Sequence, residues 1–114
     1  MASSCVFCRI YEGEIVSEIL YSDDSAFVIR DANPRAPVHL LVIPTIHLTR
    51  MGCSDHASEP LLGHLIMLAD NVANEYGLER SGYRVVINQG PDSGQEISHL
   101  HLHVMGGRRL ESMG

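Results

Sequence analysis

The chain has 114 residues, which is enough for one domain, residues 1–114, with a modest core. Hydrophobic residues make up 45% of it and charged residues 19%, as in ordinary globular proteins. The net charge of −6 argues against non-specific binding of nucleic acid or of an anionic membrane, although it leaves room for a nucleotide in a local pocket.

The cysteines and the N-terminus bear on the compartment. Cys5, Cys8 and Cys53 are odd in number and include a C-x-x-C pair, which disfavours a disulfide framework. Met1 to Ser4 lead into no signal-like segment, and no apolar run reaches about 18 residues. We therefore expect a cytoplasmic protein without a membrane segment, with the nucleus as an alternative location.

The first half of the chain predicts a short helix followed by strands. Cys5–Tyr11 is typical of about one helical turn, and Ile19–Tyr21 of a short strand. A turn at residues 22–25 leads into a strand at Ala26–Arg30, and two prolines make residues 31–37 a loop. The next strand, Val38–Ile43, is closed by Pro44. Its alternation places Val38, Leu40 and Val42 on one face and His39, Leu41 and Ile43 on the other.

The second half predicts one long helix and a further strand. Residues 45–58 are polar and irregular, with Ser58 as the N-cap of a helix that stops at Gly77. The apolar stripe of this helix spans about 160°, wider than a minimal amphipathic face. Tyr83–Asn88 is typical of a strand, and residues 89–95 form a glycine-containing turn. The stripe consists of Leu61, Leu62, Leu65, Ile66, Leu68, Ala69, Val72, Ala73 and Tyr76.

Histidine alternates with aliphatic residues over His99–Val104, the pattern of a strand with one buried face. This pattern directs Leu100, Leu102 and Val104 into the core and sets the imidazoles in a row at about 7 Å spacing. Neutral imidazoles offer metal ligation, acid–base chemistry and a nucleophilic nitrogen, and a solvated polar face is the alternative. Several strands with one main helix indicate an α+β fold with an antiparallel sheet.

An ordered set of motifs extends over nearly the whole chain. The motifs are Phe7–Ile10, Asp31, Ala36–His39, Val42–Pro44, Val86–Asn88, Gly94–Gln95, His99–Val104 and Met105–Arg108. The set resembles the HIT (histidine triad) superfamily, in its Hint branch. The resemblance implies a single HIT domain over residues 1–114, built on a five-stranded antiparallel sheet with one main helix. It also implies a homodimer in which this helix and a neighbouring strand pair into a ten-stranded sheet.

The resemblance further implies an enzyme, a nucleotide hydrolase or transferase that cleaves purine nucleoside 5′-phosphoramidates with no cofactor for catalysis. His101, the middle histidine, would attack the α-phosphate to form a nucleotidyl-histidine intermediate, which water converts to a nucleoside monophosphate. His103 and His39 would orient His101 and protonate the leaving amine. His99 is the first histidine of the triad.

The resemblance also assigns substrate-binding positions. Asn88 and the backbone amides of the Gly94–Gln95 segment would hold the phosphate. Asp31 would take the ribose hydroxyls, and Glu96 stands near the leaving group, where animal Hint proteins carry a serine. Residues matching the base sandwich are Phe7, Ile10, Ile15 and Ile29.

The C-x-x-C pair has a spacing that is common in zinc sites. Some HIT proteins with this opening resemble a structural zinc site completed by two histidines, which here are His47 and His99. Two reduced cysteines without an ion are the alternative. Zinc at a closed four-ligand site would be structural, because no position is left for substrate.

Other functions stay open on sequence alone. One is a dinucleoside polyphosphate hydrolase of the same superfamily, and another is a nucleotide-binding scaffold without turnover. A third is a metallohydrolase in which His39, His99, His101 and His103 bind a catalytic ion. Product release separates an enzyme from a scaffold, and resistance to a chelator separates the metal-independent hydrolase from the metallohydrolase.

Overall fold

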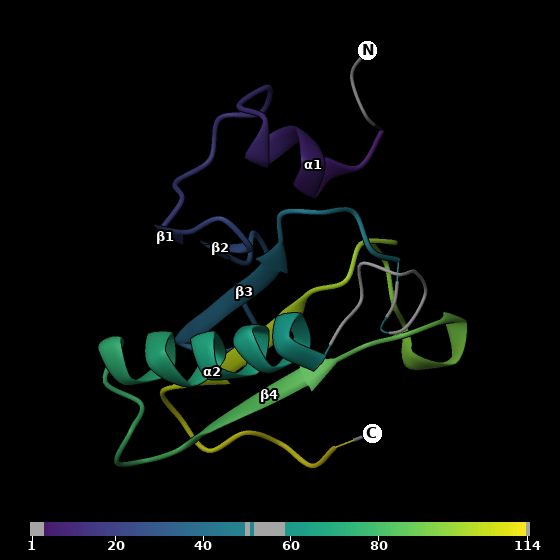
Figure 1. The fold of residues 1–114 in the computed structure, drawn as a ribbon. Helices are drawn as coiled ribbons and strands as arrows, with labels where there is room; N and C mark the ends of the chain where they lie inside the picture. Colours follow the sequence, from purple (N-terminus) through teal and green to yellow (C-terminus); the bar gives the residue numbers. More distant parts are fainter. Residues whose placement is uncertain (1–3, 50, 52–58, 114) are drawn as a thin grey trace.

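Two α-helices and one sheet make up most of the regular structure in the computed structural model, which describes residues 4–49, 51 and 59–113 (Figure 1). The predicted α+β class, with a five-stranded antiparallel sheet and one main helix, is confirmed. The helices are α1 (Val6–Tyr11) and α2 (Glu59–Glu75), and a short 3₁₀ turn is η1 (Pro91–Ser93). The strands are β1 (Tyr21–Ser22), β2 (Ala26–Arg30), β3 (Val38–Pro44), β4 (Tyr83–Ile87) and β5 (Leu102–Gly106).

The strands are hydrogen-bonded in the order β1-β2-β3-β5-β4, and each neighbouring pair is antiparallel. The C-terminal strand β5 therefore lies inside the sheet, between β3 and β4. His103 pairs with Leu41 on one side and with Val86 on the other. Because both sides of its backbone are held by the ladder, the direction of the His103 side chain is fixed.

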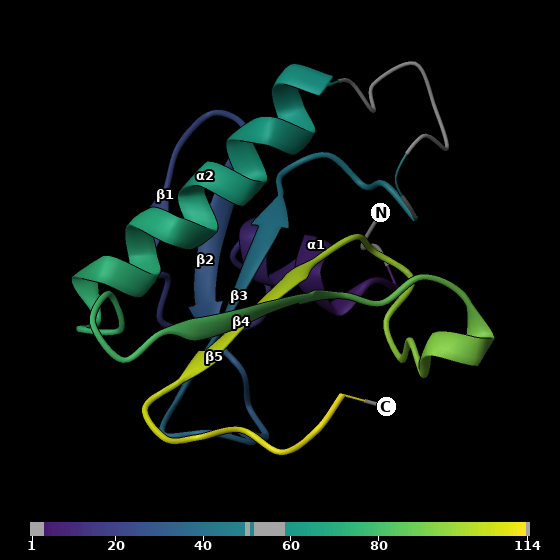
Figure 2. The same cartoon turned by 90° about the horizontal axis from the view of Figure 1, so that it is seen from below.

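The two faces of the sheet have different covers (Figure 2). The long helix α2 packs on one face, where Leu100, Leu102 and Val104 are buried in the main hydrophobic cluster. The short helix α1 lies over the other face and contributes Phe7 and Ile10 to a second cluster. Successive side chains of a strand point to opposite faces, so the histidines that alternate with these core residues lie on the α1 side.

Helix α2 ends as predicted, but only part of its apolar stripe is buried against the sheet. Gly77 follows the helix with φ +80°, a conformation that glycine adopts without strain and that stops a helix. The predicted stripe residue Ile66 is 52% exposed, because the sheet covers only the side that carries Leu65 and Leu68. The predicted N-cap Ser58 lies outside the described residues, as does Cys53. Among the described helices, none combines the length and apolar character needed to cross a membrane.

The histidine strand begins later than the sequence predicts. Strand β5 starts at Leu102, so His99 and His101 belong to the segment before it. Their side chains hydrogen-bond to backbone carbonyls: His99 Nε2 lies 3.0 Å from the Pro44 carbonyl, and His101 Nδ1 lies 2.7 Å from the His99 carbonyl. Such side-chain bonds compete with a ladder for backbone groups. The predicted direction still holds, and the alternative of a solvated face is wrong, because the three histidines are only 1–9% exposed.

Smaller differences occur at other boundaries. The first strand is Tyr21–Ser22 rather than Ile19–Tyr21, although the Leu20 N–H already donates to Val28 at 2.8 Å. Strand β3 includes Pro44, and β4 ends at Ile87, one residue before Asn88. The turn after β4 contains η1. These shifts leave the predicted order of elements unchanged.

Candidate active site and metal centre

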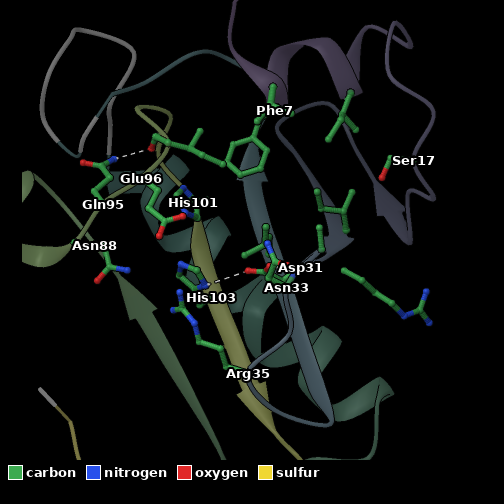
Figure 3. A pocket seen from close by; sticks show the side chains of 18 residues that line it. Phe7, Ser17, Asp31, Asn33, Arg35, Asn88, Gln95, Glu96, His101 and His103 are labelled. Atoms are coloured by element: carbon green, nitrogen blue, oxygen red, sulfur yellow. Dashed lines mark hydrogen bonds and ion pairs between the residues drawn. The ribbon is translucent and has the colours of Figure 1, made fainter.

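A cavity of about 500 Å³ opens between α1 and the histidine face of the sheet. Its middle is lined by His101 and His103, with Phe7 on one side of this pair and Arg35 on the other (Figure 3). The apolar lining consists of Val6, Phe7, Ile10, Ile29, Leu41 and Ile97. An apolar end next to polar groups in the middle suits a ligand with a flat aromatic part and a charged part.

His101 is held in one tautomer. Its Nδ1 lies 2.7 Å from the backbone oxygen of His99, and a carbonyl oxygen only accepts, so Nδ1 carries the proton. The other nitrogen of the neutral ring, Nε2, then has a lone pair. The ring of Phe7 packs edge-on against His101 with the centroids 5.0 Å apart. His101 is therefore a positioned imidazole with a nucleophilic nitrogen.

His103 and His39 form a hydrogen-bonded pair, which also has defined tautomers. The backbone N–H of Arg35 donates to His39 Nδ1 at 3.0 Å, so the proton of the neutral His39 ring is on Nε2. That nitrogen lies 2.9 Å from His103 Nδ1, to which it donates. The proton of His103 is consequently on Nε2. The ring of His103 lies 5.0 Å from that of His101, centroid to centroid, closer than the roughly 7 Å predicted for an ideal strand.

Burial controls the charge of this pair. It lowers the pKa of His103 to about 4, with the neighbouring His101 and His39 acting in the same direction. Burial also lowers the pKa of His39, against the opposing effect of the Asp31 carboxylate. Both rings are therefore neutral at pH 7 in the free protein. Asp31 Oδ2 lies 3.3 Å from His39 Nε2 and 3.9 Å from His103 Nδ1, where it would stabilise a positive charge that forms on the pair.

His99 belongs to a different cluster. Its Nε2–H donates to the Pro44 carbonyl at 3.0 Å, which leaves the lone pair on Nδ1. Nδ1 lies 3.3 Å from the Sγ of Cys5 and 3.6 Å from the Sγ of Cys8. The Nδ1 of His47 lies 3.4 Å from the same Cys8 sulfur. The predicted metal set, Cys5, Cys8, His47 and His99, is thus brought together from α1, the segment after β3 and the segment before β5.

The dimensions of this cluster match a zinc site. The ligand atoms of Cys5, Cys8, His47 and His99 all lie within 4.8 Å of one another. Zinc bonds of about 2.3 Å to sulfur and about 2.0 Å to nitrogen, at tetrahedral angles, put neighbouring S and N atoms about 3.5 Å apart. The three S···N distances of 3.3–3.6 Å fit that value. Burial lowers the pKa of His99 to about 4, so the ring is neutral, as a metal ligand must be.

The four histidines of the metallohydrolase alternative do not converge on one point. His99 Nδ1 faces the cysteines, and the facing nitrogens of His39 and His103 are joined to each other by a hydrogen bond. A second group with metal-ligand atoms within 4.8 Å of one another is Asp31, His39 and His103. In that group one nitrogen lone pair is already used between the two imidazoles.

The other predicted site residues differ in whether they line the cavity. Asn88, Gly94, Gln95 and Glu96 line the cavity. The Gly94 N–H donates to the Pro91 carbonyl at 3.1 Å, and Gln95 bonds the backbone of its own loop through Oε1 to Gly90 and Nε2 to Ile97. Ile15 is not among the lining residues but packs against the second hydrophobic cluster. His39 acts on the cavity through its contact with His103.

Several lining residues were not predicted. They are Ser17, Arg30, Asn33 and Arg35 among the polar ones, and Val6, Ala32, Leu41 and Ile97 among the apolar ones. Arg35 lies in the loop between β2 and β3, where two prolines remove any periodic pattern. The alternation over Val38–Ile43 offered a signal for Leu41, because it places Leu41 on the same face as His39.

Comparison with known proteins supports this picture. The family model described as HIT domain matches residues 12–110. The chain is 38% identical, over 99% of its length and 95% of the relative's, to a protein of Escherichia coli named purine nucleoside phosphoramidase. It resembles the crystal structure of a HIT family hydrolase from Legionella pneumophila, with 37% identity, a TM-score of 0.89 and coverage of 95% and 96% of the two chains. It also resembles a zinc-bound histidine triad family protein from Mycobacterium smegmatis, with 31% identity, a TM-score of 0.77 and coverage of 92% and 76%.

Proposed function

The chain belongs to the HIT domain family, and from that membership and the geometry around His101 we propose that it hydrolyses purine nucleoside 5′-phosphoramidates. The relative from Escherichia coli carries the name of this activity. The observation that carries the proposal is the hydrogen bond from His101 Nδ1 to the His99 carbonyl, because it leaves Nε2 unprotonated in the cavity. The products would be a nucleoside 5′-monophosphate and an amine.

In the first step, the Nε2 lone pair of His101 forms a bond to the α-phosphorus while the phosphorus–nitrogen bond breaks. The bonding electrons go to the departing nitrogen, which takes a proton from His103. Bound substrate brings negative charge next to His103 and thereby favours its protonated form. Asp31, with Oδ2 3.3 Å from His39 and 3.9 Å from His103, offsets the positive charge of that form.

In the second step, water attacks the phosphorus of the nucleotidyl-histidine. His103, now neutral, removes a proton from the water, and the bond between phosphorus and His101 breaks. The monophosphate leaves, and His101 returns to its neutral form with the proton still on Nδ1. The hydrogen bond to the His99 carbonyl serves both steps, since it holds the ring in the same orientation throughout.

The nucleoside would occupy the apolar end of the cavity. Phe7, Ile10 and Ile29 supply flat and branched apolar surface for a purine base. Asp31 lines the cavity beside the histidine pair, where its carboxylate can accept hydrogen bonds from ribose hydroxyls. Asn88 lines the cavity on the phosphate side and offers amide hydrogen bonds.

Release of AMP from adenosine 5′-phosphoramidate tests the proposed reaction. We expect turnover by the purified protein, with a dinucleoside polyphosphate cleaved more slowly in a parallel assay. Nucleotide binding without product would instead indicate a scaffold. Faster cleavage of the dinucleoside polyphosphate would assign the other hydrolase class of the superfamily.

We further propose that Cys5, Cys8, His47 and His99 hold a structural zinc ion. The matching S···N distances support this assignment, as does the similarity to a zinc-bound relative. Bound there, zinc would supply rigidity, since the protein groups fill a closed shell of four. Phe7 lies between the two cysteines in the chain. Its ring packs edge-on against those of His99 and His101, with ring centroids 5.7 and 5.0 Å apart. The ion would therefore also fix one wall of the nucleotide cavity.

Purified protein, prepared without chelator, is expected to contain about one zinc ion per chain. Cys8→Ser and His47→Gln should lose the ion and lower the unfolding temperature by about 5–10 °C, because the binding free energy of the metal contributes to folding. His64→Gln is the matched control, because His64 hydrogen-bonds to Asp23 away from this cluster. Metal analysis that finds no zinc in the wild-type protein would contradict the assignment.

We propose that the protein forms a homodimer through α2 and β4. Strand β4 is an edge of the sheet, and an edge strand exposes backbone groups that can pair with another chain. In this strand Val85 is 37% exposed, and on α2 Ile66 and Met67 are 52% and 60% exposed. Apolar surface of this kind is stabilised by burial in an interface.

Thiol ligands at a zinc site also support a cytoplasmic location, where cysteines remain reduced.

Light scattering at micromolar concentration is expected to give twice the mass of one chain. Ile66→Lys should shift the protein toward the monomer, because a charge in an apolar interface core is costly. Val16→Lys is the matched control, since Val16 is 99% exposed and lies outside α2 and β4. A monomer mass for the wild-type protein would disprove the dimer.

A further inference from the structure

Arg35 brings a positive charge to the active-site cavity without a carboxylate partner among the described residues. It lines the cavity, and its side chain lies next to His103 (Figure 3). Its proximity is also evident from its effect on the imidazoles, since it disfavours protonation and lowers the pKa of both His39 and His103. The other arginine of the lining, Arg30, is engaged with Glu18 at 2.5 Å. Arg35 is thus the cation of this lining whose guanidinium remains available to a ligand.

Two hydrogen bonds hold the backbone of Arg35, so the fold sets the point from which its exposed side chain extends. Its N–H donates to His39 Nδ1 at 3.0 Å, and its carbonyl accepts from Arg108 Nη2 at 2.8 Å. The loop that carries it is therefore attached to β3 on one side and to the segment after β5 on the other. From this point the Arg35 side chain extends toward His103 (Figure 3).

Arg35 lies at the opposite end of the cavity from Phe7. Phe7 stands at one end, His101 and His103 follow, and Arg35 lies beyond them (Figure 3). With the base against Phe7 and the phosphorus at His101, the guanidinium reaches the space past the reacting bond. In the proposed reaction, this space would hold the leaving group.

We propose that Arg35 determines specificity by binding an anionic group carried by the leaving group, close to the nitrogen or oxygen that departs. This inference rests on the proposed function. A guanidinium binds carboxylates and phosphates through paired N–H donors, so both an amino-acid carboxylate and a second phosphate fit its chemistry. Glu96, which the family resemblance puts near the leaving group, lines the cavity beside His101, and its carboxylate repels anions there. An anion on the leaving group is therefore favoured on the side of Arg35.

The test compares two phosphoramidates of equal size. In one, adenosine 5′-phosphate is joined to the nitrogen of glycine, whose carboxylate is free; in the other, it is joined to glycinamide, which is neutral. Arg35→Gln should lower kcat/KM for the glycine compound about 10- to 100-fold, the range of a charge-assisted hydrogen bond. The loss for the glycinamide compound should be at most about 5-fold, as for an exposed charge. Arg35→Lys should restore part of the difference, because it keeps the charge but not the paired donors.

Diadenosine triphosphate forms a third arm, which distinguishes a phosphate from a carboxylate as the preferred anion. A selective loss for the glycine compound, for the triphosphate or for both supports the inference and identifies the anion. An equal loss for all three compounds, or no loss, overturns it. Arg80→Gln is the matched control, since it removes the same charge from an exposed turn, and unfolding temperatures check that each variant is folded. Failure of the proposed function has another signature, the absence of turnover of the glycinamide compound by the wild-type protein.

Discussion

Replacement of His101 by alanine is expected to lower kcat for adenosine 5′-phosphoramidate by about 10⁵- to 10⁶-fold, the size of the effect when a covalent nucleophile is removed. Among the described residues, no neighbouring imidazole nitrogen is free to replace Nε2 of His101. His99 faces the cysteines, and His103 is hydrogen-bonded to His39. Binding of AMP should persist, because the apolar wall around Phe7 and the Asp31 carboxylate remain in place.

The intermediate itself provides a second measurement on the same prediction. Rapid quench of the wild-type reaction, with label in the α-phosphate, should trap label on the protein in a linkage that is labile in acid and stable in base. His101→Ala should trap none. His101→Gly should regain part of the turnover when imidazole is added, because the free imidazole can occupy the vacated space and attack the phosphorus.

His64→Ala is the matched control for these variants. His64 lies on α2 and hydrogen-bonds to Asp23 at 2.8 Å, away from the cavity lining, so its loss should leave kcat unchanged. If His101→Ala keeps near wild-type turnover and label never accumulates, His101 is not the nucleophile. Direct attack by water, activated by His39 or His103, would then have to replace the covalent route.

The sequence was sufficient for the core of this fold because its strands alternate so regularly. Ala26–Arg30 is found with the predicted bounds, and Leu100, Leu102 and Val104 are buried as the period of two requires. The same periodicity predicted the direction of the histidines but not where pairing begins. The later start of β5 at Leu102 accompanies hydrogen bonds of the His99 and His101 rings to backbone carbonyls, and periodicity contains no information on these.

Sequence patterns predict less about the site residues that lie in loops. His47 is separated from Cys8 by 39 positions, and only the family resemblance indicated that the two would meet. Arg35 lies in a loop with two prolines, and its approach to His103 depends on how that loop is attached at both ends. Ile15, which is expected at the base, packs against the cluster that contains Phe7, Ile10 and Ile29 but is not among the lining residues, so its contact with a base stays a prediction.

Substitution of His103 by alanine is expected to lower kcat about 10²- to 10⁴-fold, the range for general acid–base catalysis. His39→Ala should have a smaller effect of the same kind, because His39 acts through the hydrogen bond of 2.9 Å that orients His103. The double variant should lose little more than His103→Ala alone, since residues that act as one unit are not additive.

The leaving group provides the decisive measurement for this second prediction. A substrate whose leaving group departs without protonation, such as the p-nitrophenyl ester of AMP, does not need the proton of His103. The comparison uses kcat/KM, which reports formation of the nucleotidyl-histidine and not its later hydrolysis, where His103 also acts as a base. The loss of kcat/KM in His103→Ala should therefore shrink by at least about tenfold with the ester, compared with the phosphoramidate of a basic amine. In His101→Ala the loss should be equally large with both substrates, because both require the nucleophile. If His103→Ala lost the same factor with the ester as with the amine, His103 would stabilise the phosphoryl oxygens instead of protonating the departing nitrogen.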